Sequence, residues 1–137
     1  MISSATLESW TPRALGLLRI VIGYLYLQHG SAKLLGFPHV AMFDTLTLMS
    51  LFGLAGVLEL VGGFLILIGL FVRPVAFILS GEMAVAYFMA HASKGNTLFP
   101  SLNGGELAVV YCFVFLFFVA AGAGAWSVDA SMRKRPA

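Results

Sequence analysis

Four long apolar stretches constrain this chain more than any other feature. They cover residues 14–35, 46–72, 74–92 and 106–126 and leave only short connecting segments. A helix of about 20 mostly apolar residues crosses a hydrocarbon core of about 30 Å, and each stretch is close to that length. Hydrophobic residues make up 60% of the 137 residues and charged residues only 10%, a balance that excludes an ordinary soluble domain. We therefore expect an all-α membrane protein with a single transmembrane domain over residues 1–137.

The basic residues outside these stretches predict the orientation, because Lys and Arg beside membrane spans are retained on the cytoplasmic side. An even number of spans places both termini on one face, together with the turn between the second and third stretches. That face carries Arg13, Arg73, Arg133, Lys134 and Arg135. The opposite face carries Lys33 and Lys94. We expect a left-handed antiparallel four-transmembrane-helix bundle in the cell (inner) membrane, multi-pass, with both termini cytoplasmic. The basic tail is then a topology signal, and no nucleic-acid partner is expected.

Three of the stretches carry a charged residue where a lipid-facing helix should have none: Arg19, Glu59 and Glu82. Such residues are costly in lipid and normally face the interior of a bundle. Counted at 1.5 Å per residue from the cytoplasmic ends of the stretches, Arg19 lies about 8 Å deep, Glu82 about 12 Å and Glu59 about 20 Å. We therefore predict an intramembrane ion pair between Arg19 and Glu82. Its role is open to a structural or a functional interpretation.

One face of the first stretch combines polar residues with glycines. It consists of Arg19, Gly23, Tyr26, Gly30 and Lys33, which fall within about 40° of one line at 100° per residue. Small residues let neighbouring membrane helices approach closely, and the second stretch has glycines on both sides of Glu59 in the same way. We expect each of these faces to pack closely against a neighbouring helix, with the charges inward.

The other polar residues gather toward the outer ends of the stretches and form a candidate polar site. Its members are His29, Lys33, Glu59, His91 and Glu106. An imidazole and a carboxylate in an apolar pocket suit a quinone head group, which needs a proton donor at each carbonyl. No catalytic residue is assigned. The competing interpretation is that both histidines lie near the interface and only hydrogen-bond neighbouring side chains or water.

The sequence fixes no cofactor, although a bound quinone would suit the polar site. A haem held by His29 and His91 is geometrically feasible in a four-helix bundle, but two histidines carry little information and no haem is expected. No metal is expected either, because His39 stands at no ligand spacing. The single Cys112 excludes an intrachain disulfide and a Cys-x-x-Cys pair, so redox chemistry would need a borrowed cofactor.

Several short motifs occur together, in order and in register with the four stretches. In the first half they are Leu18-Arg19-Ile20, Gly23, His29-Gly30, Lys33, Glu59-Leu60, Gly62-Gly63 and Gly69-Leu70. In the second half they are Glu82-Met83, Ala86, His91, Gly105-Glu106-Leu107 and the segment from Gly122 to Asp129. By these motifs the chain resembles the DoxX family of small four-span membrane proteins over residues 13–129. The resemblance implies the four-span fold. Some relatives are associated with membrane redox complexes, including thiosulfate:quinone oxidoreduction and thiol-linked oxidative stress defence, and more distant ones look like carriers.

Three functional classes follow from these observations. The leading one is a component of a membrane redox complex, quinone- or thiol-linked, with the lipid bilayer and other complex subunits as partners. The second is a small-molecule or proton-coupled carrier, which would use Arg19 with Glu59 or Glu82 as a switch and would need a homodimer. The third is a non-catalytic assembly subunit that packs through the phenylalanine-rich fourth stretch. The sequence leaves open whether the protein is an enzyme, and it names no substrate.

Overall fold

The computed structural model describes residues 3–133, and every regular element in that part of the chain is helical. The long helices are α1 (Ser4–Leu35), α2 (Leu51–Ile68), α3 (Val72–Ala86) and α5 (Glu106–Ala121). The short ones are η1 (Ala41–Phe43), η2 (Tyr87–His91), η3 (Ala92–Lys94), α4 (Pro100–Asn103) and α6 (Val128–Arg133). The all-α prediction is confirmed. Lys134 and Arg135 of the predicted basic tail lie outside the described residues.

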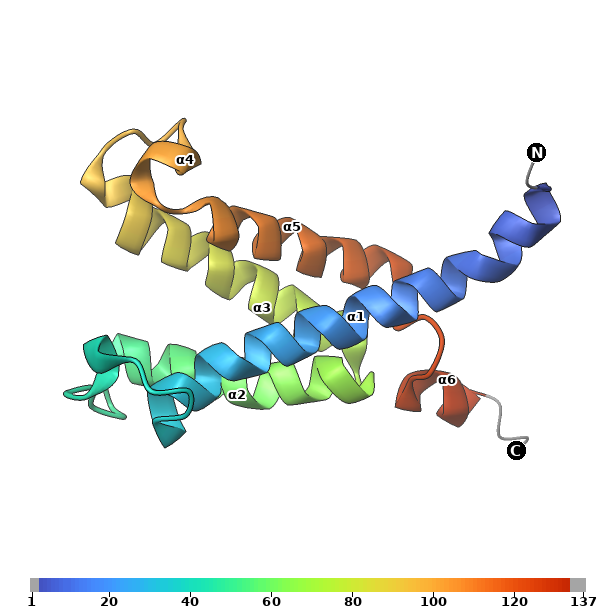
Figure 1. The fold of residues 1–137 in the computed structure, drawn as a ribbon, viewed down its shortest axis with the longest axis horizontal. Coiled ribbons are helices and arrows are strands. Elements are labelled where there is room, and N and C mark those ends of the chain that lie inside the picture. Colours follow the sequence, from blue (N-terminus) through green and yellow to red (C-terminus); the bar gives the residue numbers. More distant parts are fainter. Residues whose placement is uncertain (1–2, 134–137) are drawn as a thin grey trace.

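The long helices form two hairpins, with α1 packed along α2 and α3 packed along α5 (Figure 1). Consecutive long helices run in opposite directions. The beginning of α1, the α2–α3 turn and α6 lie at one end of the molecule, and we call this the junction end (Figure 1). At the opposite end, the loop end, lie η1 and α4, and α3 diverges from α2 in that direction (Figure 1).

Two helical runs are long and apolar enough to cross a membrane, namely α2 and the continuous run Val72–Lys94. Helix α5 is apolar but has only 16 residues. Helix α1 has 32 residues, and polar side chains such as Arg19 and Gln28 interrupt its apolar sequence. Length and composition alone therefore support two of the four predicted spans.

Capping interactions set the ends of α2, which is shorter than the apolar stretch 46–72. Ser50 accepts a hydrogen bond at its side-chain oxygen from the N–H of Gly53, at 3.1 Å, and so begins the helix. Gly69 adopts φ 75°, a left-handed conformation that glycine tolerates best, and it ends the helix. The segment before α3 is therefore a turn rather than a continuation of α2.

Glycines bring α1 and α2 into backbone contact: the sequence predicted close packing at these glycines, and the structure shows that the two helices meet each other there. A Cβ atom added at Gly30 would lie 2.2 Å from the amide nitrogen of Leu60, and one at Gly23 would lie 2.5 Å from that of Leu67. Gly63 of α2 approaches α1 from the other side, where a Cβ would lie 2.7 Å from the nitrogen of Leu27. This contact fixes the register of the two helices.

An aromatic cluster joins the two hairpins. Tyr26 of α1 packs edge-on against Tyr111 and Phe115 of α5, with ring centroids 5.2 and 4.8 Å apart. Such pairs contribute about 0.5–1.5 kcal/mol beyond their burial. Phe113 and Phe117 of the same helix remain exposed, so α5 presents one aromatic face to the core and another to its surroundings.

The α1–α2 contact predicts a large effect of a single methyl group. Gly30→Ala should destabilise the protein by about 1–3 kcal/mol, because the backbone of α2 must move to admit the new atom. Gly81→Ala in α3 is the matched control, since nothing lies within 4 Å of its added Cβ. Thermal unfolding in detergent should show a lower midpoint for the first variant only; equal midpoints would contradict the close packing.

Candidate functional site

Arg19 lies at the centre of the junction end and is fully buried. Its guanidinium donates hydrogen bonds to five backbone carbonyl oxygens. Two belong to the last turn of α2, Ile66 at 2.8 Å and Leu67 at 2.5 Å. The other three belong to the segment after α5: Ala123 at 2.7 Å, Ala125 at 3.2 Å and Trp126 at 2.8 Å. A cation is favoured at a helix C-terminus, where carbonyl groups lack partners within the helix.

Two further side chains complete this junction. Asp129 accepts hydrogen bonds from the N–H groups of Phe71 and Val72, both at 2.9 Å, and so caps the N-terminus of α3 from a distant part of the chain. Arg73 donates to the carbonyl oxygens of Val119 and Ala120 at the end of α5. Three helix termini are therefore satisfied by charged side chains at one end of the molecule.

The predicted ion pair between Arg19 and Glu82 is wrong. Arg19 is saturated by carbonyl oxygens, and Glu82 instead accepts a hydrogen bond at Oε2 from the hydroxyl of Tyr26, at 2.8 Å. Among residues 3–133 the ion pairs are Lys33 with Glu59 and His39 with Asp44. Arg19 therefore stabilises the fold, and Glu82 belongs to a different group of residues.

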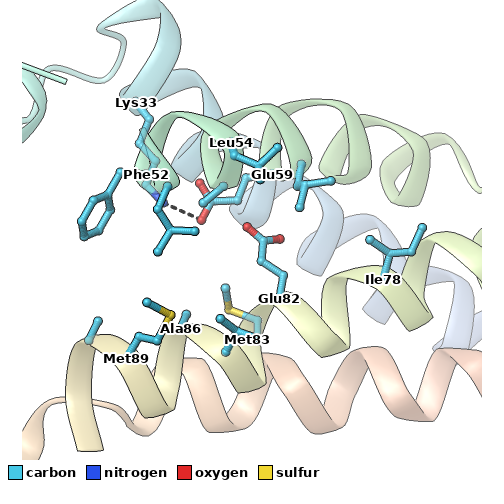
Figure 2. Close-up of a pocket in the computed structure, with 14 residues that line it drawn as sticks. Lys33, Phe52, Leu54, Glu59, Ile78, Glu82, Met83, Ala86 and Met89 are labelled. Atoms are coloured by element: carbon cyan, nitrogen blue, oxygen red, sulfur yellow. Dashed lines mark hydrogen bonds and ion pairs between the residues drawn. The ribbon is translucent and has the colours of Figure 1, made fainter. Parts of the chain in front are cut away.

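Glu82 faces Glu59 across a cavity between α2 and α3 (Figure 2). Lys33 Nζ lies 2.7 Å from Glu59 Oε1, and both side chains are largely buried. The second oxygen of each carboxyl group, Glu59 Oε2 and Glu82 Oε1, is buried without a hydrogen-bond partner. Buried polar atoms are nearly always paired, so two unpaired carboxyl oxygens at one cavity indicate a functional position.

The cavity has a volume of about 380 Å³, and its wall is apolar apart from Lys33, Glu59 and Glu82. Its mouth is formed by exposed apolar side chains of both helices: Leu51, Phe52, Leu54, Ile78, Val85 and Met89. Pockets of about 300–1,000 Å³ with few polar groups are typical of small-molecule sites. We call this space the α2–α3 cavity.

The predicted depth of Glu59 is wrong because the apolar stretch 46–72 is not one helix: α2 ends at Ile68. Glu59 lies nine residues before the end of α2 at Ile68, and Glu82 lies ten residues after the start of α3 at Val72. Two helices that meet in a tight turn place such residues at nearly the same height, about 14–15 Å from it. Gly69, a typical helix C-cap, was the signal that could have corrected the count.

The structure brings together four of the five residues of the predicted polar site. His29, Lys33, Glu59 and His91 line a second cavity of about 250 Å³ between the hairpins, next to the α2–α3 cavity. Glu106 does not line either cavity; it is exposed in the first turn of α5.

The two histidines differ in their surroundings. His91 Nδ1 lies 3.3 Å from the carbonyl oxygen of Asn103, and its ring stacks on Tyr87. This local contact agrees with the competing interpretation, in which the histidines only hydrogen-bond groups close to them. His29 is exposed and packs edge-on against Tyr111, with ring centroids 6.0 Å apart.

Comparison with known proteins identifies the family. The family model described as DoxX matches residues 14–92, which include Arg19, Lys33, Glu59 and Glu82. The chain belongs to the DoxX family. A Haemophilus influenzae protein described as uncharacterized is 48% identical over 136 residues, and the alignment covers 94% of this chain and 98% of that protein. No solved structure matches the chain significantly. As a DoxX family member the chain is a membrane protein.

In this DoxX protein, Tyr26 and Asp129 have roles that the sequence analysis missed. Tyr26 stood on the predicted polar face of the first stretch, but its contact with Glu82 depends on how the hairpins pack. Asp129 was noted only as the end of a family motif. An acidic residue after a glycine-rich segment gives no sign that it caps a helix almost sixty residues earlier in the chain.

The contacts of Arg19 predict that a lysine cannot replace it. Arg19→Lys should destabilise the protein by at least about 3 kcal/mol, because one ammonium cannot reach carbonyl oxygens on both segments and each buried unpaired carbonyl costs about 1–3 kcal/mol. Unfolding followed by intrinsic fluorescence in detergent measures the loss. Arg13→Lys, at an exposed position, is the control and should be nearly neutral. If Glu82→Gln destabilised as much as Arg19→Lys and the double variant added nothing, the rejected ion pair would be restored.

Proposed function

We propose that the protein is a four-span protein of the cell (inner) membrane with both termini cytoplasmic. The spans would be α1, α2, the run Val72–Lys94 and α5. Membership of the DoxX family and the exposed apolar side chains on all four helices support this proposal. Arg13, Arg73 and Arg133 lie toward the junction end, which agrees with a cytoplasmic position for that end.

We further propose that the protein is a component of a membrane redox complex and that the α2–α3 cavity binds the head group of a lipophilic carrier, with a quinone as the leading candidate. The observation that supports this most is the pair of unpartnered carboxyl oxygens on an otherwise apolar wall. A quinone has polar carbonyl groups on an apolar ring and tail. Lys33 and a protonated carboxyl group would donate hydrogen bonds to such carbonyls.

The mouth of the cavity suits a ligand that arrives from the bilayer. Leu54 of α2 and Ile78 of α3 stand at this mouth with more than half of their surfaces exposed, so a membrane-dissolved molecule could enter between the helices. A thiol-linked role has less support, because Cys112 lies beside Ser80 and lines neither cavity. The quinone-linked form of the redox proposal is therefore preferred.

A proton-coupled carrier that works as a homodimer is the second candidate, and the same two carboxyl oxygens favour it. Its switch would consist of Glu59 and Glu82, since Arg19 is held by backbone carbonyls. A non-catalytic assembly subunit would use the exposed face of α5, where Phe113 and Phe117 lie.

The orientation can be tested with single cysteines in a Cys112→Ser background. A membrane-impermeant maleimide should label Ser93→Cys at the loop end in intact spheroplasts, and should label Ser9→Cys at the junction end only after the membrane is permeabilised. All three positions are described, and Ser9 and Ser93 are exposed. Labelling of Ser9→Cys in intact spheroplasts would reverse the proposed topology.

The ligand can be tested by its retention. Protein purified from native membranes into lipid nanodiscs should carry a quinone that mass spectrometry detects, and Glu82→Gln and Lys33→Met should each reduce its amount at least about tenfold, the equivalent of about 1.4 kcal/mol. Glu106→Gln is the matched control, because this exposed glutamate lines neither cavity.

The alternatives predict different results in the same preparation. Wild-type protein without quinone, but with pH-driven flux in vesicles that Glu82→Gln abolishes, would replace the redox proposal with the carrier. Protein without quinone or flux that co-purifies with a stable partner would favour the assembly subunit.

A further inference from the structure

We propose that Glu59 and Glu82 together hold a single proton, so that the α2–α3 cavity contains a proton-binding site. The inference deepens the proposed function, on which it rests only for the identity of the ligand that meets this proton. Its own basis is the geometry and charge of the two carboxyl groups.

The geometry leaves one position open on each carboxyl group. Glu59 is engaged at Oε1 by Lys33 and Glu82 at Oε2 by Tyr26, at 2.7 and 2.8 Å. The remaining oxygens have no partner, and the side chain of Glu59 is only 4% exposed. Figure 2 shows the two carboxyl groups pointing toward each other across the cavity. An ionised carboxylate accepts hydrogen bonds only, so an unpaired oxygen in this position is better satisfied as a carboxylic acid.

The charges around the pair support one proton rather than none or two. Lys33 supplies one positive charge for two carboxyl groups. Two carboxyl groups that share a buried site repel each other strongly when both are ionised. Carboxylate dyads of this kind therefore retain one proton. With one proton bound, Lys33 and the remaining carboxylate balance, and the buried group is neutral.

Other titratable groups near the pair do not supply the missing charge. Tyr26 of α1 donates a neutral hydroxyl to Glu82, and Tyr111 of α5 lines the second cavity. His29 of α1 is an exposed residue that lines that cavity too, and among residues 3–133 the hydrogen bonds of the two carboxyl groups come from Lys33 and Tyr26 instead. Arg19 is engaged by carbonyl oxygens at the junction end.

The position of this proton would let the two glutamates donate a hydrogen bond to a ligand in the cavity. Both glutamates line the cavity, so the proton that their buried, unpartnered oxygens share would lie beside the place where a head group binds. A carboxylic acid there donates a hydrogen bond to a carbonyl oxygen, which an ionised carboxylate cannot do. Glu59 and Glu82 would then be binding residues whose hydrogen-bonding character depends on one shared proton.

Infrared difference spectroscopy of the full chain, freed of bound quinone in detergent and reconstituted into nanodiscs of synthetic lipid, tests the proposal without a ligand when neutral and alkaline pH are compared. Wild-type protein should show one protonated-carboxyl band that shifts in D₂O. Glu59→Gln and Glu82→Gln should each abolish it, because the charge of Lys33 at the same cavity then balances the one carboxyl group that remains, which ionises. Glu106→Gln and Glu8→Gln, at exposed positions, are controls that should retain the band.

Several outcomes would overturn the inference. Loss of the band in only one of the two glutamine variants would indicate an independent protonated glutamate. Absence of the band in folded wild-type protein would show that both groups are ionised. A band that appears only when sodium is replaced by choline would indicate a metal cation in place of the proton.

A conservative variant tests the shared proton without removing a carboxyl group, so the result does not depend on whether the glutamine variants fold. Tyr26→Phe keeps both carboxyl groups and removes only the hydrogen bond to Glu82, so the band should persist at a shifted frequency. An unshifted band would contradict the proposal. Because the protein in this measurement carries no quinone, a band that behaves as expected would support the shared proton even if the quinone proposal failed.

Discussion

The structure depends on the buried guanidinium of Arg19. Its five donors hold the end of α2 and the segment after α5 against α1, so three distant parts of the chain meet at one side chain. Asp129 follows directly in this segment and caps α3. Because these contacts all lie at the junction end, the helices are fixed there and α3 is free to diverge from α2 farther along (Figure 1). The α2–α3 cavity is a consequence of this one-sided attachment.

Helix α1 links the junction to the candidate site. Its glycine face fixes the height of α2, and that contact sets Lys33 beside Glu59. Tyr26, about two turns before Lys33, reaches across to Glu82 and at the same time packs against the rings of α5. A single helical face therefore carries the structural arginine, the packing glycines and two of the polar groups at the cavity.

The candidate site was predictable to different degrees for different residues. Lys33 and Glu59 were predicted to lie near each other because both fall toward the outer ends of their stretches, a depth that can be counted along the sequence. Glu59 and Glu82 were predicted at different heights because the height of Glu59 depends on where α2 ends, and a cap at Gly69 outweighs the three apolar residues that follow it in the stretch. Glu106 was misplaced for another reason: the first turn of α5 turns it outward, and spacing alone does not tell which side of that helix faces the core.

The sequence by itself determined that the chain is helical and apolar, that α1 and α2 have glycine faces for close packing, and that Arg19, Glu59 and Glu82 face inward, because periodicity and the cost of charge in lipid are local properties. Only the tertiary structure decided which groups these charges meet. Backbone carbonyls can satisfy an arginine as well as a carboxylate can, and no residue pattern marks which carbonyls a fold leaves unpaired. With Arg19 satisfied by carbonyls, the two glutamates were left to face each other across the α2–α3 cavity.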